Sequence, residues 1–592
     1  MRDFFKSLMA SCLGVVLAVF VLIFIGSILI GKSVNSAMDS KKNVSANSVL
    51  ELNFKNDLPE KTDNVEASFS LKDSKTIGLQ DMIETIRKAK EDSNIKGIFL
   101  DLSDCNVSFT KASELRKTLI DFKSGGKFIT SYSKYYSQKS YYLASVANKI
   151  YMHPVGGMDF RGIAVQIPFM KDLLGRLDVN MQIYYAGQFK SATESLRLDK
   201  MSPQNRLQTH EYIDGIYNHL LQDISESRKI SVADLKNMAN TFALQTADDA
   251  IRLKMGDAIG YRDEVLADLR NSLGIGSTES INTVSIGDYF ESKEEKTDFA
   301  IKNKIAVVYA EGNIEEGKKT NGTIGGDKYA EIIRKIREEG DIKAIVLRIN
   351  SGGGSSMASE NIWREVVLAR EKGIKVVVSM GDYAASGGYY IACAADSIVA
   401  EPTTLTGSIG VFGIMPSFEN TMKNKVGVTF DTVRTGQFAT SFNAFKNNSA
   451  QEGAIIQQNI DRTYEIFLKR VADGRHITRD QVHAIAQGRV WLGEKAIKIG
   501  LVDKLGNLED AVKIAANLIG ADKYRWKEYP VKQEKFQQIL NKLKGEDEED
   551  ESGVKAEFFR SQLGEFKPVF DQISLIKSMK GPQVRLPFLI NY

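Results

Sequence analysis

The feature that most constrains this sequence is an internal repeat. The segment IKGIFLDLSDC, which begins at Ile95, is matched 247 residues later by IKAIVLRINSG. SYYLASVANKIYMHP, from Ser140, is matched 248 residues later by GYYIACAADSIVAEP, and AGQFKSATESL, from Ala186, is matched 249 residues later by TGQFATSFNAF. Composition cannot produce so nearly constant an offset, so we infer two copies of one unit, over residues 45–297 and 298–545.

Each copy alternates two kinds of segment. AIVLRI and KVVVSM, in the second copy, have the length and β-branched content of buried strands, whereas SENIWREVVLAREKG has the spaced apolar positions and closing glycine of a helix. This alternation predicts an α/β fold. At 592 residues the chain is also too long for one ordinary core, which agrees with two repeated units.

The two ends of the chain differ from the repeats. Residues 8–31, LMASCLGVVLAVFVLIFIGSILIG, carry no charge and as a helix would span roughly 36 Å, enough to cross a bilayer. A cleaved secretory signal is the alternative, but its apolar region is typically about 7 to 15 residues, so we favour an uncleaved transmembrane helix. Basic residues on both sides leave its orientation open. Residues 546–592 are predicted to be an acidic linker and a C-terminal segment of unassigned structure.

Charge and metal-binding residues argue against several classes of function. The 78 basic and 75 acidic side chains nearly cancel, and no stripe of Lys and Arg predicts nucleic-acid binding. Cys12 lies in the apolar span, which leaves Cys105 and Cys393, too few for a disulfide framework. The five histidines show no spacing suited to zinc, so we expect no metal site.

Comparison of the two copies isolates a candidate active site. In the second copy the strand AIVLRIN runs into SGGGSS, whose glycines leave backbone N–H groups unobstructed, whereas the first copy reads SDCNVS. Ser386, in MGDYAASGGYY, aligns with Gln138, and Lys190, in GQFKSA, aligns with Ala439. Taken singly these residues are typical of a turn, a helix cap or a solvated surface. Together they indicate that each copy supplies what the other lacks.

A serine and a lysine can form a catalytic pair. The hydroxyl is a poor nucleophile until a base removes its proton, and lysine can be that base only as a neutral amine. The unperturbed pKa of lysine is about 10.4, so burial must lower it. YYAGQFKSA surrounds Lys190 with aromatic and small residues, and the nearest acid, Glu194, is four positions on. The predicted reaction is acyl transfer through an acyl-enzyme, with neither metal nor cofactor.

The sequence resembles the signal peptide peptidase A family in its long, membrane-anchored form with two tandem repeats. The segments that carry the resemblance are INSGGGSSMASE, GDYAASGGYYIACAAD, TGSIGVFG, GQFKSATE and GRVWLGEKAIKIGLVDKLG. The family's fold is similar to that of the ClpP protease and crotonase, with spiralling ββα units. The resemblance implies Ser386 as nucleophile and Lys190 as general base, with Ser408 hydrogen-bonded to the lysine amine and oxyanion donors among Gly353, Gly354 and Gly387.

One position departs from the family's pattern. The family loop commonly reads Asn-Ser-Pro-Gly-Gly, whereas this chain has Gly352 where the proline is expected. The loop therefore loses the restraint that a proline ring places on the backbone, and the choice among the three glycines as donors stays open.

The resemblance further implies a membrane-bound serine endopeptidase that hydrolyses cleaved signal peptides and other apolar peptides. It places the chain in the bacterial inner membrane as a single-pass protein, in contact with lipid through residues 8–31, with the catalytic part on the extracytoplasmic, periplasmic side. It also implies a homotetramer, a ring of four chains. In a head-to-tail ring Lys190 meets Ser386 within one chain, and Ala439 faces the Gln138 site of another chain.

Two alternatives remain open from the residues alone. A crotonase-like acyl-CoA enzyme also stabilises an oxyanion with backbone amides, and fold likeness does not distinguish it from a peptidase. A non-catalytic membrane scaffold would explain the loss of the serine from the first copy.

Overall fold

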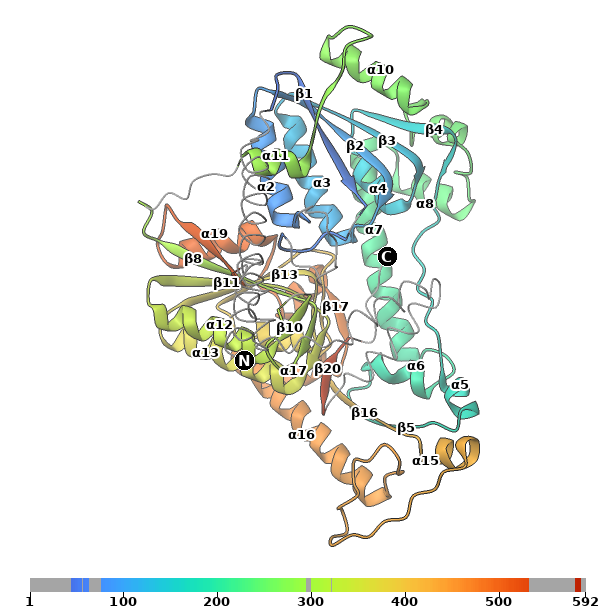
Figure 1. Ribbon diagram of the computed structural model, residues 1–592, viewed down its shortest axis with the longest axis vertical. Helices are drawn as coiled ribbons and strands as arrows, with labels where there is room; N and C mark the ends of the chain where they lie inside the picture. Colours follow the sequence, from blue (N-terminus) through green and yellow to red (C-terminus); the bar gives the residue numbers. More distant parts are fainter. Residues whose placement is uncertain are drawn as a thin grey trace, which may run out of the picture.

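The computed structural model describes residues 44–55, 57–62, 76–293, 300–320, 322–531 and 581–586. The predicted transmembrane helix, residues 8–31, lies outside these ranges, as does most of the predicted C-terminal linker. Across the described ranges, no helix combines the length and the apolar character needed to cross a bilayer. The described residues form three sheets and the helices that cover them (Figure 1).

The first repeat contains a parallel sheet in the order β6-β4-β3-β2-β1-β7. Helices cover both of its faces, so the central strands are apolar on both sides. The strands are β1 (Ser48–Phe54), β2 (Ile95–Cys105), β3 (Phe128–Tyr136), β4 (Lys149–Met158), β6 (Ala258–Ile259) and β7 (Asn282–Ser285). One face is covered by α2 (Leu79–Glu91), α3 (Phe109–Ser124), α4 (Gln138–Ala144), α7 (Pro203–Arg228), α8 (Val232–Asn240) and α9 (Ala247–Arg252), and the other by α10 (Arg262–Leu273).

The second repeat has the same core arrangement. Its strands β8 (Lys304–Glu311), β11 (Ile342–Ser351) and β13 (Lys375–Ala385) lie side by side and parallel, as β1, β2 and β3 do. Around them lie β14 (Ser397–Ala400), β15 (Leu405–Gly407), β17 (Val490–Leu492), β18 (Lys504–Leu505) and β19 (Arg525–Tyr529). One face is covered by α12 (Gly326–Glu339), α13 (Ser356–Glu371), α14 (Gly387–Ala392) and α16 (Ala450–Arg475), and the other by α19 (Leu508–Leu518). The prediction of two tandem α/β repeats is confirmed.

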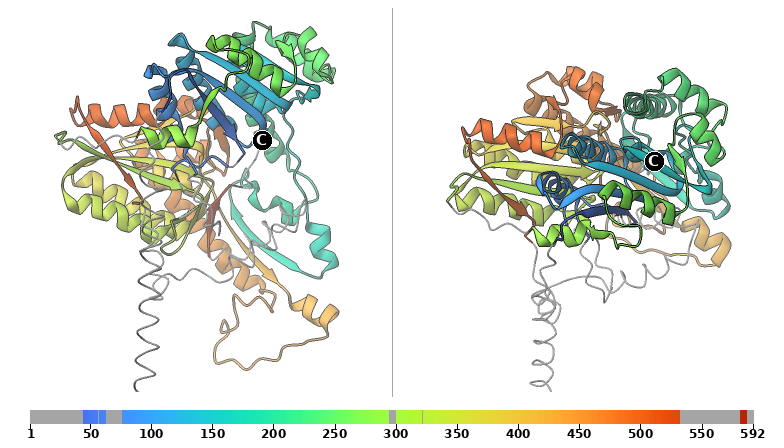
Figure 2. Two further views of the ribbon diagram at one scale, coloured as in Figure 1. Left: turned by 45° about the horizontal axis from the view of Figure 1, so that its top comes forward. Right: turned by 90° about the horizontal axis from the view of Figure 1, so that it is seen from above.

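A third sheet, in the order β10-β9-β12-β20-β16-β5, joins the two repeats. β5 (Asn180–Ala186) belongs to the first repeat, yet it pairs antiparallel along its whole length with β16 (Val411–Ser417) of the second. The chain leaves β4, runs to β5 and returns through α7, and in Figure 2 β5 and β16 extend together away from the two main sheets. The other strands of this sheet are β9 (Asn313–Glu315), β10 (Thr323–Gly325), β12 (Gly353–Ser355) and β20 (Gln583–Arg585).

Shorter helices connect these elements. They are α5 (Lys171–Arg176), α6 (Glu194–Arg197), α11 (Ile286–Ser292), α15 (Glu419–Thr421), α17 (Arg479–Ile485) and α18 (Gly493–Ala496). The chain passes from the first main sheet to the second between α11 and β8. β20 falls within the C-terminal segment to which the sequence assigned no structure.

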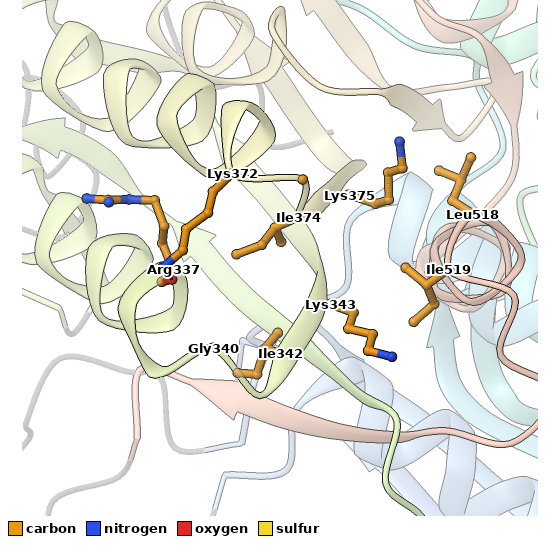
Figure 3. A pocket seen from close by; sticks show the side chains of 10 residues that line it. Arg337, Gly340, Ile342, Lys343, Lys372, Ile374, Lys375, Leu518 and Ile519 are labelled. Atoms are coloured by element: carbon orange, nitrogen blue, oxygen red, sulfur yellow. Dashed lines mark hydrogen bonds between the residues drawn. The ribbon is translucent and has the colours of Figure 1, made fainter.

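The candidate residues follow the carboxyl ends of neighbouring strands in the second repeat. Gly352 follows β11, Ser386 follows β13 and Ser408 follows β15. Because parallel strands end at the same edge of a sheet, these loops converge there. A pocket of about 360 Å³ lies at the opposite edge, around Lys343 and Lys375 at the starts of β11 and β13 (Figure 3), and is therefore separate from this site.

Candidate active site

Ser386 occupies a strained turn between β13 and α14. Its φ of 55° and ψ of −112° place a non-glycine residue in the positive-φ region, at a cost of about 1–3 kcal/mol. Its N–H donates to the carbonyl of Gly407 at 2.8 Å, and its carbonyl accepts from the N–H of Tyr390 at 2.8 Å. These two bonds hold the backbone in a conformation that a free chain would rarely adopt.

The small residues around Ser386 let the surrounding segments close on it. A Cβ atom on Gly387 would lie 2.8 Å from Ser359 Oγ, and one on Gly388 would lie 2.7 Å from the carbonyl oxygen of Ser351. Both distances are shorter than van der Waals contact, so a larger side chain would displace α13 or the end of β11. The Ser386 side chain is fully buried as a result.

Lys190 reaches the site from the first repeat. It follows β5 through a turn in which Phe189 N–H donates to the carbonyl of Gln487, in the second repeat, at 2.8 Å. A Cβ on Gly488 would lie 2.6 Å from Lys190 N, so the glycine is what allows the two backbones to approach. The Lys190 side chain is only 1% exposed.

The amine of Lys190 meets two serines of the second repeat. Its Nζ lies 2.8 Å from Ser386 Oγ, 3.1 Å from Ser408 Oγ and 3.1 Å from the Ser408 carbonyl oxygen. Burial alone lowers the pKa of the Lys190 amine well below its ordinary value. Glu194 does not oppose this, because its carboxylate accepts from Ser202 and Asn205 instead. The site therefore favours the neutral amine that a general base requires.

The backbone around Ser408 places this residue in contact with the amine of Lys190. Like Ser386 it is a non-glycine residue with a positive φ, of 51°, and it is fully buried. Its N–H donates to the carbonyl of Arg489 at 2.7 Å. Its hydroxyl and its carbonyl both face Nζ, so the residue can orient the lysine as the resemblance implied.

The three candidate oxyanion glycines have different hydrogen bonds. Gly353 N–H donates to Ser351 Oγ at 3.1 Å, and Gly354 lies in β12, paired with β9 on one side and β20 on the other. Gly387 is the first residue of α14, where an N–H has no partner within the helix. A Cβ on Gly353 would lie 2.6 Å from Gly387 N, so the two backbones touch. The geometry favours Gly387 as a donor, and the role of Ser351 was not predicted.

The residues that align with Ser386 and Lys190 supply neither a nucleophile nor a base. Gln138 accepts from Gly162 N–H at 3.0 Å through its Oε1 atom. Ala439 lies in an exposed turn in which its N–H donates to Gly436 O at 3.2 Å, as Lys190 N–H donates to Gly187 O at 3.1 Å. The two turns share this hydrogen bond but differ in burial and in the side chain, which is a lysine in the first copy and an alanine in the second.

A buried ionic network beside the site was also missed. Arg348, in β11, donates to Glu60 at 2.9 Å and to Glu114 at 2.8 Å, and both acids belong to the first repeat. Desolvation raises the pKa of Glu114 to about 7 although Arg348 opposes the rise. The network fixes one repeat against the other just before the glycine loop. The sequence did contain a signal for this network, because Arg348 is a charged residue within the apolar run AIVLRI.

Known proteins are similar to this chain over most of its length. Peptidase family S49 matches it twice, over residues 121–276 and 368–522. Protease 4 of Salmonella typhi is 40% identical over 74% of this chain and 72% of that protein, and Protease 4 of Haemophilus influenzae is 34% identical over the same shares. The chloroplastic serine protease SPPA of Arabidopsis thaliana is 31% identical over 74% of this chain and 65% of that protein.

Similarity to solved structures is much weaker. A ClpP1 mutant from Listeria monocytogenes is 15% identical, with a TM-score of 0.24 over 35% of this chain and 94% of that chain, too low to support an argument. The family assignment rests on the two matched segments and on the three relatives. The chain belongs to peptidase family S49 and is a serine protease.

Proposed function

We propose that the chain is a membrane-bound endopeptidase in which Ser386 is the nucleophile and Lys190 the general base. The observation that supports this is the 2.8 Å contact between Nζ and Oγ in a site shielded from water. Neutral Lys190 takes the hydroxyl proton as Oγ attacks a peptide carbonyl, and then gives it to the leaving amine. Water activated by the same amine hydrolyses the acyl-enzyme.

The backbone N–H of Gly387 supplies an oxyanion donor in this mechanism. It immediately follows the nucleophile, so it moves with Ser386 and faces the carbonyl oxygen under attack. Ser408 acts through Lys190, by fixing the direction of the amine.

The substrates we propose are cleaved signal peptides and other apolar peptides at a membrane. The uncharged segment 8–31 supports a single membrane-spanning anchor. The bacterial inner membrane, with the two repeats on the periplasmic side, is the location that the resemblance supports. Cleavage of such peptides requires the active site to lie near the bilayer in which they are left.

We also propose that four chains assemble head to tail. Within one chain β5 of the first repeat pairs with β16 of the second. The repeat offset makes residues 163–169 the counterpart of β16 and residues 429–435 the counterpart of β5, and neither segment forms a strand in the single chain. Val433 is wholly exposed and Phe430 is half exposed. We propose that these two segments pair between neighbouring chains and so close the homotetramer.

The test is covalent labelling of the nucleophile. We expect an acylating serine reagent to form one adduct, mapped to Ser386 by mass spectrometry, and the same purified protein to cleave a mixed pool of apolar peptides. Ser386→Ala is expected to lose both properties, while Ser145→Ala, at an equally buried serine of the first repeat, keeps them. Peptidase activity at the parent's rate in Ser386→Ala would reject the mechanism. Turnover of an acyl-CoA thioester without an adduct would support the crotonase-like alternative.

A further inference from the structure

The side chain of Gln208, on α7, is buried against the turn that carries Lys190. Its Nε2 atom donates to the carbonyl of Phe189 at 3.1 Å and to Ser191 Oγ at 3.0 Å. Phe189 and Ser191 are the residues immediately before and after Lys190. The side-chain amide of Gln208 therefore holds the turn on both sides of the lysine in the sequence.

The same amide also binds the second repeat. Its Oε1 atom accepts from the N–H of Val490, the first residue of β17, at 3.1 Å. Val490 pairs with Gly407 of β15, and the carbonyl of Gly407 accepts the N–H of Ser386 at 2.8 Å. Gln208 is thus joined to the turn of the lysine on one side and, through β17 and β15, to the backbone of the serine on the other.

The partners of Gln208 fix the orientation of its amide. The N–H of Val490 can only donate and the carbonyl of Phe189 can only accept, so Oε1 must face the first and Nε2 the second. Asn205, one turn earlier on α7, also accepts from Nε2, at 3.3 Å. Asn205 is itself held, because its Nδ2 atom donates to Glu194 at 2.9 Å. A buried amide whose partners are all fixed positions a backbone more exactly than apolar packing does.

The second repeat lacks this glutamine where it lacks the lysine. The helices α7 and α16 both have 26 residues and begin 247 residues apart, at positions 203 and 450. At this offset Gln208 corresponds to Ile455, which is 43% exposed. The turn that this helix follows holds Ala439 in place of Lys190. The glutamine and the lysine occur together in one copy and are both replaced in the other, as expected if one serves the other.

We propose that Gln208 is a positioning residue of the peptidase, whose side-chain amide sets the distance and direction of Lys190 Nζ toward Ser386 Oγ. This inference rests on the proposed function of Ser386 and Lys190. Gln208 acts through the two residues that flank the lysine rather than through its amine. A misplacement of about 1 Å can cost about 100-fold in rate, so the contribution of Gln208 is expected in kcat rather than in KM.

Two variants of similar side-chain volume test this role. Gln208→Met removes all the hydrogen bonds of the amide, whereas Gln208→Glu keeps an acceptor for the N–H of Val490 and loses the donor to the carbonyl of Phe189. We expect each to lower kcat for a short apolar peptide about 10- to 100-fold with little change in KM. Gln222→Met, the same change at an exposed position of α7, is expected to match the parent.

The pH at which kcat falls on acidification is a readout that loss of stability alone would not move. In Gln208→Met a looser turn admits water to the amine, and in Gln208→Glu a carboxylate beside the turn favours the charged lysine. Each change raises the lowered pKa of Lys190, so the fall in kcat is expected to begin at higher pH than in the parent. A kcat like the parent's, or a fall at the parent's pH, in both variants would overturn the inference.

Hydrogen–deuterium exchange separates this inference from the proposed function. The N–H of Lys190 donates to the carbonyl of Gly187 at 3.1 Å and is protected while the turn is held. In a Ser386→Ala background, the peptic peptide that contains this turn is expected to exchange faster with Gln208→Met than with Gln222→Met. The comparison needs no nucleophile, so it remains valid if Ser386 proves not to be catalytic. Equal exchange rates in the two variants would overturn the inference on their own.

Discussion

The amine of Lys190 lies 2.8 Å from the hydroxyl of Ser386, although 196 residues and a change of repeat separate them. The contact exists because β5 leaves its own repeat to pair with β16. The contact is closed to water, and this burial lowers the pKa of the Lys190 amine, which favours the neutral form that can accept a proton. Each repeat therefore contributes one member of the pair that we propose to be catalytic.

Activity is expected to fall as the pH is lowered, with the pH dependence of a single titrating group. Because burial lowers the pKa of Lys190, the amine is neutral and competent above that lowered pKa and protonated below it. The measurement is kcat/KM for a short peptide from about pH 5 to pH 9. An acid limb that persists unchanged in a Lys190 variant with residual activity would assign it to another group.

Lys190→Met is expected to raise the unfolding temperature while it removes activity. The unfolded lysine binds a proton below its ordinary pKa, but the buried amine does so only below its lowered pKa. Between the two pKa values the unfolded chain binds more protons than the folded chain. The free energy of unfolding therefore falls by about 1.4 kcal/mol for each unit by which the pH is lowered within this range. Calorimetry from about pH 7 to pH 9 is expected to show a flatter profile for the variant. If the stability of Lys190→Met changes with pH as steeply as that of the parent, burial of a neutral amine would be contradicted.

Ser408→Ala is expected to lower kcat about 10- to 100-fold and to shift the acid limb. The variant loses the hydroxyl that lies 3.1 Å from Nζ, whereas the carbonyl contact remains. The amine is then less well oriented, and its pKa changes because one hydrogen-bonding partner is gone. A variant that matches the parent in both kcat and limb position would make Ser408 a purely structural residue.

Moving the lysine to the other repeat is expected to fail. In Lys190→Ala, the further change Ala439→Lys places an amine on an exposed turn away from Ser386. Proton transfer needs heavy-atom contact of about 3 Å, so the double variant is expected to stay inactive in a peptide cleavage assay. Recovery of activity would mean that the pair closes within one repeat and that the two halves are not complementary.

The sequence predicts the site better than it predicts the way the site is assembled. Ser386 and Lys190 stand out because each aligns with a residue, Gln138 or Ala439, that cannot serve as nucleophile or base. The strand pairings that bring Ser386 and Lys190 together cannot be recognised in the sequence in this way. β5 reads NMQIYYA and β20 reads QVR, and nothing in either segment specifies a partner hundreds of residues away.

Side-chain detail is the other part that sequence did not supply. The three glycines of the loop are equivalent in sequence, but Ser351 takes the N–H of Gly353 and leaves that of Gly387. Likewise Arg348 is only a charge in an apolar strand until Glu60 and Glu114 are brought to it from the first repeat. Such roles depend on tertiary contacts, which local pattern does not encode.

The rate at which an acylating reagent labels Ser386 tests the central claim, that a lysine of one repeat activates the serine of the other. Intact-protein mass spectrometry gives this rate without any peptide substrate. Lys190→Ala is expected to reduce it by about 10²- to 10⁴-fold at neutral pH. Lys139→Ala, which removes another lysine of the first repeat whose pKa is lowered by burial, is expected to label at the parent's rate. Labelling of Lys190→Ala at the parent's rate would contradict the account.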